Sequence, residues 1–120
     1  MSLAPYIKSA DWKAEKHVPA ITVLGQFVAG QPLEVEVAVG KEIPHPNTVE
    51  HHIAWIQLFY VDDGSQLPTE LGRAELAAHG SVATGAVARF SVILGNPGKL
   101  LALAYCNLHG LWEGEAAVGV

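Results

Sequence analysis

The only cysteine of the chain is followed three residues later by a histidine, and the two side chains could bind one metal ion. Cys106 ends an apolar run, and His109 lies in the short stretch that follows it. A thiolate and an imidazole together suit zinc, copper or iron. The pair alone is a weak signal, because a lone cysteine at the end of an apolar strand is often just a small buried hydrophobic residue.

Five further histidines lie upstream, and three of them occupy predicted junctions between loops and strands, where binding sites are commonly built. His17 ends the N-terminal loop, His45 stands between two prolines, and His51 opens a predicted strand. His52 is adjacent to His51, and neighbouring side chains of a strand point to opposite faces. At most one of the two should therefore face a given metal, and spacing does not say which. His79 lies far from the others, which favours an ordinary surface histidine.

Several metal sites fit such a set of residues. Zinc would use four ligands in a tetrahedron, whereas blue copper would use two histidines, a cysteine and usually an axial methionine. Met1 is the only methionine, which disfavours copper. Four histidines in a plane with one cysteine beneath would leave a position open, which suits a redox iron. The alternatives are a small copper electron-transfer protein using Cys106 and His109, and a β-sandwich without metal.

Composition sets the class of protein. Half of the 120 residues are hydrophobic and 16% are charged, which is typical of one globular domain, residues 1–120. The net charge of −5 does not favour binding to nucleic acid or to an anionic membrane. One cysteine excludes an internal disulfide and a four-cysteine metal site. Without a signal peptide or an 18-residue apolar run, we expect a cytoplasmic protein that does not enter a membrane.

Short apolar runs separated by glycine and proline predict an all-β protein. Residues 33–39 alternate between apolar and polar, which indicates a half-buried strand. Residues 51–61 are apolar on both faces, which indicates a central strand. Seven such strands predict an immunoglobulin-like antiparallel β-sandwich. We place the strands at residues 21–28, 33–39, 51–61, 71–78, 86–94, 100–106 and 111–120.

Three sequence blocks resemble the superoxide reductase family, and more narrowly its one-iron members, the neelaredoxins. The blocks are Glu-Lys-His-Val-Pro at 15–19, residues 40–53 with Pro-His-Pro-Asn-Thr and Glu-His-His-Ile, and Cys-Asn-Leu-His-Gly-Leu-Trp at 106–112. They occur in the family's order and span nearly the whole chain. Desulfoferrodoxins add a desulforedoxin-like domain with a four-cysteine iron site. The single cysteine here leaves no room for that site, so one iron is expected.

The resemblance implies an iron centre with four equatorial imidazoles and an axial thiolate, and it selects His51 rather than His52. Glu15 matches a carboxylate that becomes the sixth ligand in the oxidised state. Lys16 matches the residue that attracts superoxide and helps protonation. The N-terminal loop that carries both would form a lid over the metal site. The ligands implied are His17, His45, His51, Cys106 and His109.

The resemblance also implies a reaction and partners. Superoxide would be reduced by one electron to hydrogen peroxide, without production of dioxygen. An external electron donor, rubredoxin in the family, would restore the ferrous iron, and the chain would form a homotetramer. The stretch 80–87 is shorter than the family leads us to expect, which affects the shape of that loop and the packing of subunits.

Overall fold

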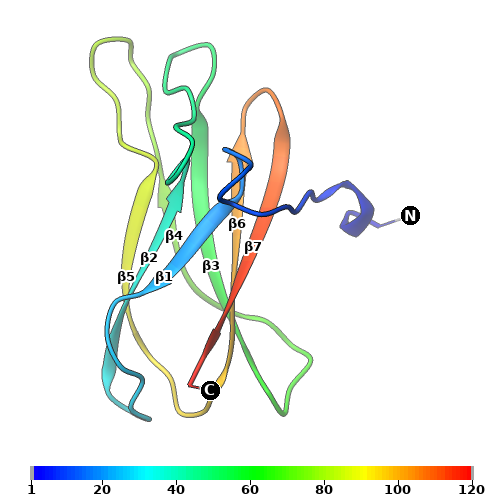
Figure 1. Cartoon of the computed structure of the whole chain (residues 1–120), viewed down its shortest axis with the longest axis vertical. Helices are drawn as coiled ribbons and strands as arrows, with labels where there is room; N and C mark the ends of the chain where they lie inside the picture. Colours follow the sequence, from blue (N-terminus) through cyan, green and yellow to red (C-terminus); the bar gives the residue numbers. More distant parts are fainter. Residues whose placement is uncertain (1, 120) are drawn as a thin grey trace.

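A computed structural model describes residues 2–119, which form two antiparallel sheets packed face to face (Figure 1). The smaller sheet has the order β1-β2-β5, and the larger has the order β4-β3-β6-β7. This arrangement confirms the predicted seven-stranded, immunoglobulin-like sandwich. The elements are the 3-10 helix η1 (Ala4–Tyr6) and the strands β1 (Pro19–Val23), β2 (Pro32–Val39), β3 (Ile53–Asp62), β4 (Thr69–Glu75), β5 (Val87–Ile93), β6 (Gly98–Cys106) and β7 (Gly110–Val118).

The core lies between the two sheets. Strand β2 alternates as predicted, and its residues Val35 and Val37 are fully buried. Strands β3 and β6 pair in the middle of the larger sheet, and Ile56, Leu58 and Leu100 from them are also fully buried. A central position for β3 was predicted from its apolar character. The paired β3 and β6 form the central part of the larger sheet, and the loops that follow β6 and precede β3 extend from one end of this pair.

Several strand boundaries were predicted wrongly, among them the end of β4, which is Glu75 rather than residue 78. Strand β1 ends at Val23 rather than at residue 28, and Gly25 follows with a φ of 146°, outside the range of ordinary strands. Strand β3 begins at Ile53, so His51 and His52 precede it in an irregular turn. The strand-alternation argument for these two histidines therefore does not apply. The last strand ends at Val118, and residues 1 and 120 of the predicted domain lie outside the described residues.

The connection between β4 and β5 is held by hydrogen bonds of its own and by one bond from the loop after β2. Ala78 and Ala83 form an isolated antiparallel bridge, and the backbone N–H of His79 donates to the carbonyl of Val82 at 2.7 Å. The side-chain amide of Asn47 donates to the carbonyl of Thr84 at 3.0 Å, which ties this connection to the loop after β2. The connection is thus closed by hydrogen bonds at the same end of the sandwich as that loop.

Three segments far apart in the sequence meet at one end of the sandwich, the upper end in Figure 1. They are the N-terminal segment, the connection between β2 and β3, and the β6–β7 turn. Backbone hydrogen bonds from Lys8 to Leu111 (3.1 Å) and from Glu113 to Lys8 (2.9 Å) anchor the N-terminal segment on β7. No helix among residues 2–119 is long and apolar enough to span a membrane.

Gly114 of β7 lets β1 approach closely just after His17. A Cβ atom at this position would lie 2.2 Å from the carbonyl oxygen of Pro19. We expect Gly114→Ala to lower the free energy of unfolding by about 1–3 kcal/mol, because the backbone of β1 must shift. Urea unfolding measures the change. Gly85→Ala is the control, since no atom lies within 4 Å of its added Cβ; equal losses for the two variants would contradict the steric explanation.

Candidate metal centre

The β6–β7 turn places a thiol in the core and an imidazole near the surface. Cys106 and Gly110 are paired residues at the ends of the two strands, and Gly110 has a φ of 81°, which glycine adopts without strain. Cys106 is completely buried, whereas His109 is exposed. The turn therefore places the sulfur of Cys106 on the core side of the site and the imidazole of His109 on its solvent side.

His17 is held by Trp112 and by Glu15. Its ring stacks on Trp112 at a centroid distance of 4.8 Å, and the indole N–H of Trp112 donates to the carbonyl of His109 at 3.2 Å. The carboxylate of Glu15 accepts hydrogen bonds from the backbone N–H of His17 at 2.9 Å and from its Nδ1 at 2.7 Å. Because Nδ1 carries the proton in this pairing, Nε2 keeps its lone pair for the site.

His45 and His51 come from the connection between β2 and β3. The Nδ1 of His45 donates to the carbonyl of Pro46 at 2.6 Å, and its Nε2 lies 3.5 Å from the sulfur of Cys106. The Nε2 of His51 lies 3.2 Å from the Nδ1 of His109. A carbonyl can only accept, so the lone pair of His45 is also on the nitrogen that faces the sulfur.

The four imidazoles form a ring. Successive centroid distances around it are 4.8 Å from His17 to His45, 4.6 Å to His51, 4.9 Å to His109 and 4.9 Å back to His17. The distance across the ring from His17 to His51 is 6.3 Å, close to the diagonal of a square with these sides. The sulfur of Cys106 lies 3.5 and 3.7 Å from nitrogens of two opposite corners, His45 and His109.

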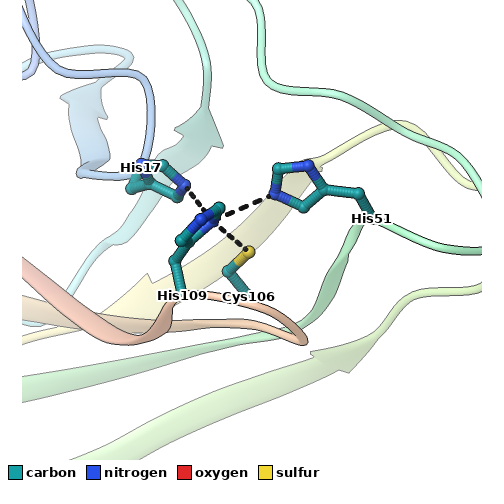
Figure 2. Close-up of side chains that lie close together, drawn as sticks. All are labelled: His17, His51, Cys106 and His109. Atoms are coloured by element: carbon teal, nitrogen blue, oxygen red, sulfur yellow. Dashed lines mark hydrogen bonds between the residues drawn. The ribbon is translucent and has the colours of Figure 1, made fainter.

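The contacts within the ring have the spacing of metal ligands. The Nδ1 of His109 faces three partners, His17, His51 and Cys106, at 3.2, 3.2 and 3.7 Å (Figure 2). One ring nitrogen offers a single proton or a single lone pair, so it cannot bond all three. A metal–imidazole bond of about 2.1 Å would separate two ligands at right angles by roughly 3.0 Å. The donor set therefore fits a metal ion.

The tightest group of donor atoms omits one histidine. Single ligand atoms of His17, His51, Cys106 and His109 lie within 4.8 Å of one another (Figure 2). His45 is not part of this group and meets it through Cys106 and through the rings of His17 and His51. All five side chains singled out in the sequence thus converge, four of them most closely.

The surroundings of His45 and His51 favour the neutral form of these two imidazoles. Burial lowers the pKa of His45 from 6.5 to about 4, against the opposing effect of its hydrogen bond to Pro46. Desolvation, and then the charge of His109, also lower the pKa of His51. Metal ions bind neutral imidazole, so the lowered pKa values of His45 and His51 favour the state that ligation requires. The hydrogen bond to His17 lowers the pKa of Glu15, which favours its carboxylate form.

An open pocket borders the ring on the side of the N-terminal segment. Glu15, Lys16, His17 and His109 line it, together with Ala14 and Ile43. The positive charge of Lys16 contributes to lowering the pKa of both His45 and His51, so its field reaches the ring. A small anion could approach the ring through this pocket.

The other two histidines do not join the ring. The Nδ1 of His52 bonds the carbonyl of Thr48 at 2.9 Å, and His79 is exposed in the β4–β5 connection. Sequence reasoning missed the contributions of Trp112 and Asn107, although both belong to the Cys-Asn-Leu-His-Gly-Leu-Trp block. Only their position within that block could have drawn attention to them.

Comparison with known proteins agrees with this geometry. The pattern of the family described as Desulfoferrodoxin matches residues 9–115, which include the four ring histidines and Cys106. The chain belongs to the desulfoferrodoxin family. Within this family, a protein named superoxide reductase from Pyrococcus horikoshii is 52% identical over 109 residues, covering 91% of this chain and 92% of the relative.

Two further family members resemble the chain over its length. A protein named neelaredoxin from Megalodesulfovibrio gigas is 40% identical, covering 100% of this chain and 99% of the relative. The structure of a superoxide reductase (neelaredoxin) from Archaeoglobus fulgidus in the reduced form is 52% identical. It covers 96% of this chain and 99% of that one, with a TM-score of 0.87. The family resemblance seen in the sequence is thereby confirmed.

The lowered pKa of His45 makes the stability of the apo-protein depend on pH. Between about pH 6.5 and pH 4 the unfolded chain binds a proton at His45 that the folded chain does not. The contribution of His45 to the free energy of unfolding should therefore be complete above pH 6.5. It should decrease as the pH is lowered from there to about 4. Urea unfolding of the metal-free protein at several pH values measures this dependence.

His45→Gln provides the control for this prediction, because it removes the titrating group and keeps a polar side chain of similar size. The variant should show a flatter dependence on pH in the same window. The lowered pKa of Glu15 acts in the same direction, but only below about 4.5. An identical slope for the variant and the parent protein would contradict the assignment to His45.

Proposed function

We propose that this protein is a superoxide reductase with one iron, held by the single domain predicted for residues 1–120. The observation that carries the proposal is the ring of four imidazoles beside one buried thiolate. Relatives named superoxide reductase, about 50% identical over most of the chain, support it. A copper electron carrier would leave two of the imidazoles without a role, and it would lack an internal methionine.

The proposed ligands divide into two kinds. His17, His45, His51 and His109 would hold the iron by neutral nitrogens, and Cys106 would hold it by sulfur from the core side. When bound, iron supplies a one-electron couple. The complete burial of Cys106 keeps its sulfur away from water, and the neighbouring rings fix its position. The ligand atoms are thus largely in place before the metal binds, which lowers the ordering cost of binding.

Lys16 and Glu15 would act on the pocket side. Superoxide is an anion and the chain carries a net charge of −5, so the ammonium of Lys16 provides the local attraction that the whole molecule lacks. The openness of the pocket to water supplies protons for the product. Glu15 would serve as the sixth ligand of the oxidised centre, and the segment that carries it would act as the lid.

The reaction requires partners outside the chain. Each superoxide takes up one electron and two protons to give one hydrogen peroxide, with no dioxygen released. The electron must come from a donor protein, for which we propose rubredoxin. We also propose that the chain assembles as a homotetramer and works in the cytoplasm without nucleic-acid or membrane partners.

The stoichiometry of the products tests this function. The iron-loaded protein, supplied with a reductant, should convert each superoxide into one hydrogen peroxide without producing dioxygen. A dismutase would release one dioxygen for every two superoxides. An oxygen electrode and a peroxide assay measure the two products, and metal analysis of the purified protein should give one iron per chain. Dioxygen in the dismutase ratio, or copper in place of iron, would overturn the proposal.

The variant Cys106→Ser serves as the control for the metal centre. It removes the thiolate and should abolish the sulfur-to-iron charge-transfer band of the oxidised protein, together with turnover. Absorption spectroscopy measures the band. A band that persists in the variant would remove Cys106 from the ligand set.

Lys16→Met should slow the association of superoxide by about tenfold and weaken its dependence on salt, because a steering charge is lost. Pulse radiolysis at several ionic strengths measures both effects. Lys99→Met is the matched control, since Lys99 lies next to the β5–β6 turn and lines a different pocket with Asp62 and Asp63. An unchanged rate for Lys16→Met would refute the steering role.

A further inference from the structure

Asn107 joins the two segments that carry His51 and His109. Its side-chain Oδ1 accepts a hydrogen bond from the backbone N–H of His52 at 2.9 Å, and its Nδ2 donates to the carbonyl of Glu50 at 3.0 Å. The backbone N–H of Asn107 also donates to the carbonyl of His52 at 3.2 Å. One residue of the β6–β7 turn therefore bonds the chain on both sides of His51.

Apart from the bond of Asn47 to Thr84 and the pairing of Ile53 with Cys106, the segment around His51 has little other support from the sandwich. It lies before β3, and its own hydrogen bonds close a local turn: the N–H of Thr48 donates to the carbonyl of His51 at 2.9 Å, and the N–H of His51 bonds Thr48 in return. These bonds shape the turn without attaching it to the sheets. The contacts of Asn107 supply that attachment, beside Cys106 at the end of β6.

Only an amide fits both positions. The atom of the Asn107 side chain that faces an N–H must accept, and the atom that faces a carbonyl must donate. Aspartate could accept but not donate, and leucine of similar size could do neither. The pairing also fixes the orientation of the amide, because the reverse orientation would place donor against donor and acceptor against acceptor.

We infer that Asn107 is a positioning residue for the metal centre, which holds the imidazole of His51 in reach of the metal by bonding the backbone on both sides of it. The inference rests on the proposed role of His51 as a ligand. It assigns to the amide a role distinct from that of the ligands themselves, because Asn107 acts only through the backbone of its neighbours.

Binding of Co²⁺ to the metal-free protein tests this role without reference to turnover. Asn107→Leu should weaken Co²⁺ binding by about tenfold or more, the usual effect of removing a partner that orients a ligand. Its Co²⁺ absorption spectrum should resemble that of His51→Ala while keeping the sulfur-to-cobalt band from Cys106. Co²⁺ affinity equal to that of the parent protein would overturn the inference.

A double-mutant cycle separates positioning of His51 from general damage. If Asn107 acts through His51, the variant His51→Ala/Asn107→Leu should bind Co²⁺ within about twofold of His51→Ala alone, because the ligand that Asn107 positions is already gone. Losses that add in full would overturn the inference while leaving the ligand set intact. Unchanged binding by His51→Ala itself would instead overturn the ligand assignment, and the inference with it.

Two further variants keep the test decisive. Asn96→Ala removes an amide that bonds Asp62 at 2.9 Å in the β5–β6 turn, and it should leave Co²⁺ binding unchanged. Circular dichroism shows whether each variant folds. If Asn107→Leu does not fold, Asn107→Asp takes its place in the same cycle, since it retains the size of the side chain and the bond to His52. The effect of its added charge on Co²⁺ cancels between the two halves of the cycle.

Discussion

The β6–β7 hairpin is the constraint on which the rest of the centre depends. Pairing of β6 with β3 in the middle of the larger sheet buries Cys106 completely, and pairing with β7 closes the turn at Gly110. The sulfur can then be reached from only one side, the end of the sandwich. The three other histidines, His17, His45 and His51, approach that point from loops. The N-terminal segment and the β2–β3 connection make this approach.

Loops that carry ligands need restraints that strands obtain from their ladders. Each histidine that comes from a loop has a different one. Glu15 and Trp112 hold His17, the carbonyl of Pro46 holds His45, and Asn107 bonds the backbone around His51. These restraints also set the tautomers of His17 and His45, because each places a hydrogen-bond acceptor against Nδ1. The positions of the imidazoles are thus set by residues that contact these histidines or the backbone beside them.

The sequence predicted the sandwich well, because alternating apolar residues and glycine–proline turns report directly on strands. The sequence was less informative where tertiary contacts determine at which residue a strand begins or ends. Strand β1 stops at Val23 although apolar residues continue to residue 28, and His51 lies in a turn because Thr48 closes hydrogen bonds with it. The three blocks identified the residues that converge, through their resemblance to a family. No spacing rule could reveal the stacking of Trp112 on His17 or the two bonds of the Asn107 amide, since these depend on how loops fold against each other.

The position of Glu15 shows what its ligation of a metal would entail. Its Oε1 accepts from both the backbone N–H and the Nδ1 of His17, whereas the Nε2 of the same ring faces the other imidazoles. Since Nδ1 and Nε2 lie on different edges of the ring, this carboxylate cannot keep both bonds and also reach a metal at Nε2. Ligation by Glu15 would therefore require its carboxylate to leave His17. His17 would lose its Nδ1 acceptor in the same step, so that entry of the carboxylate and the basicity of one histidine ligand are coupled through a single side chain.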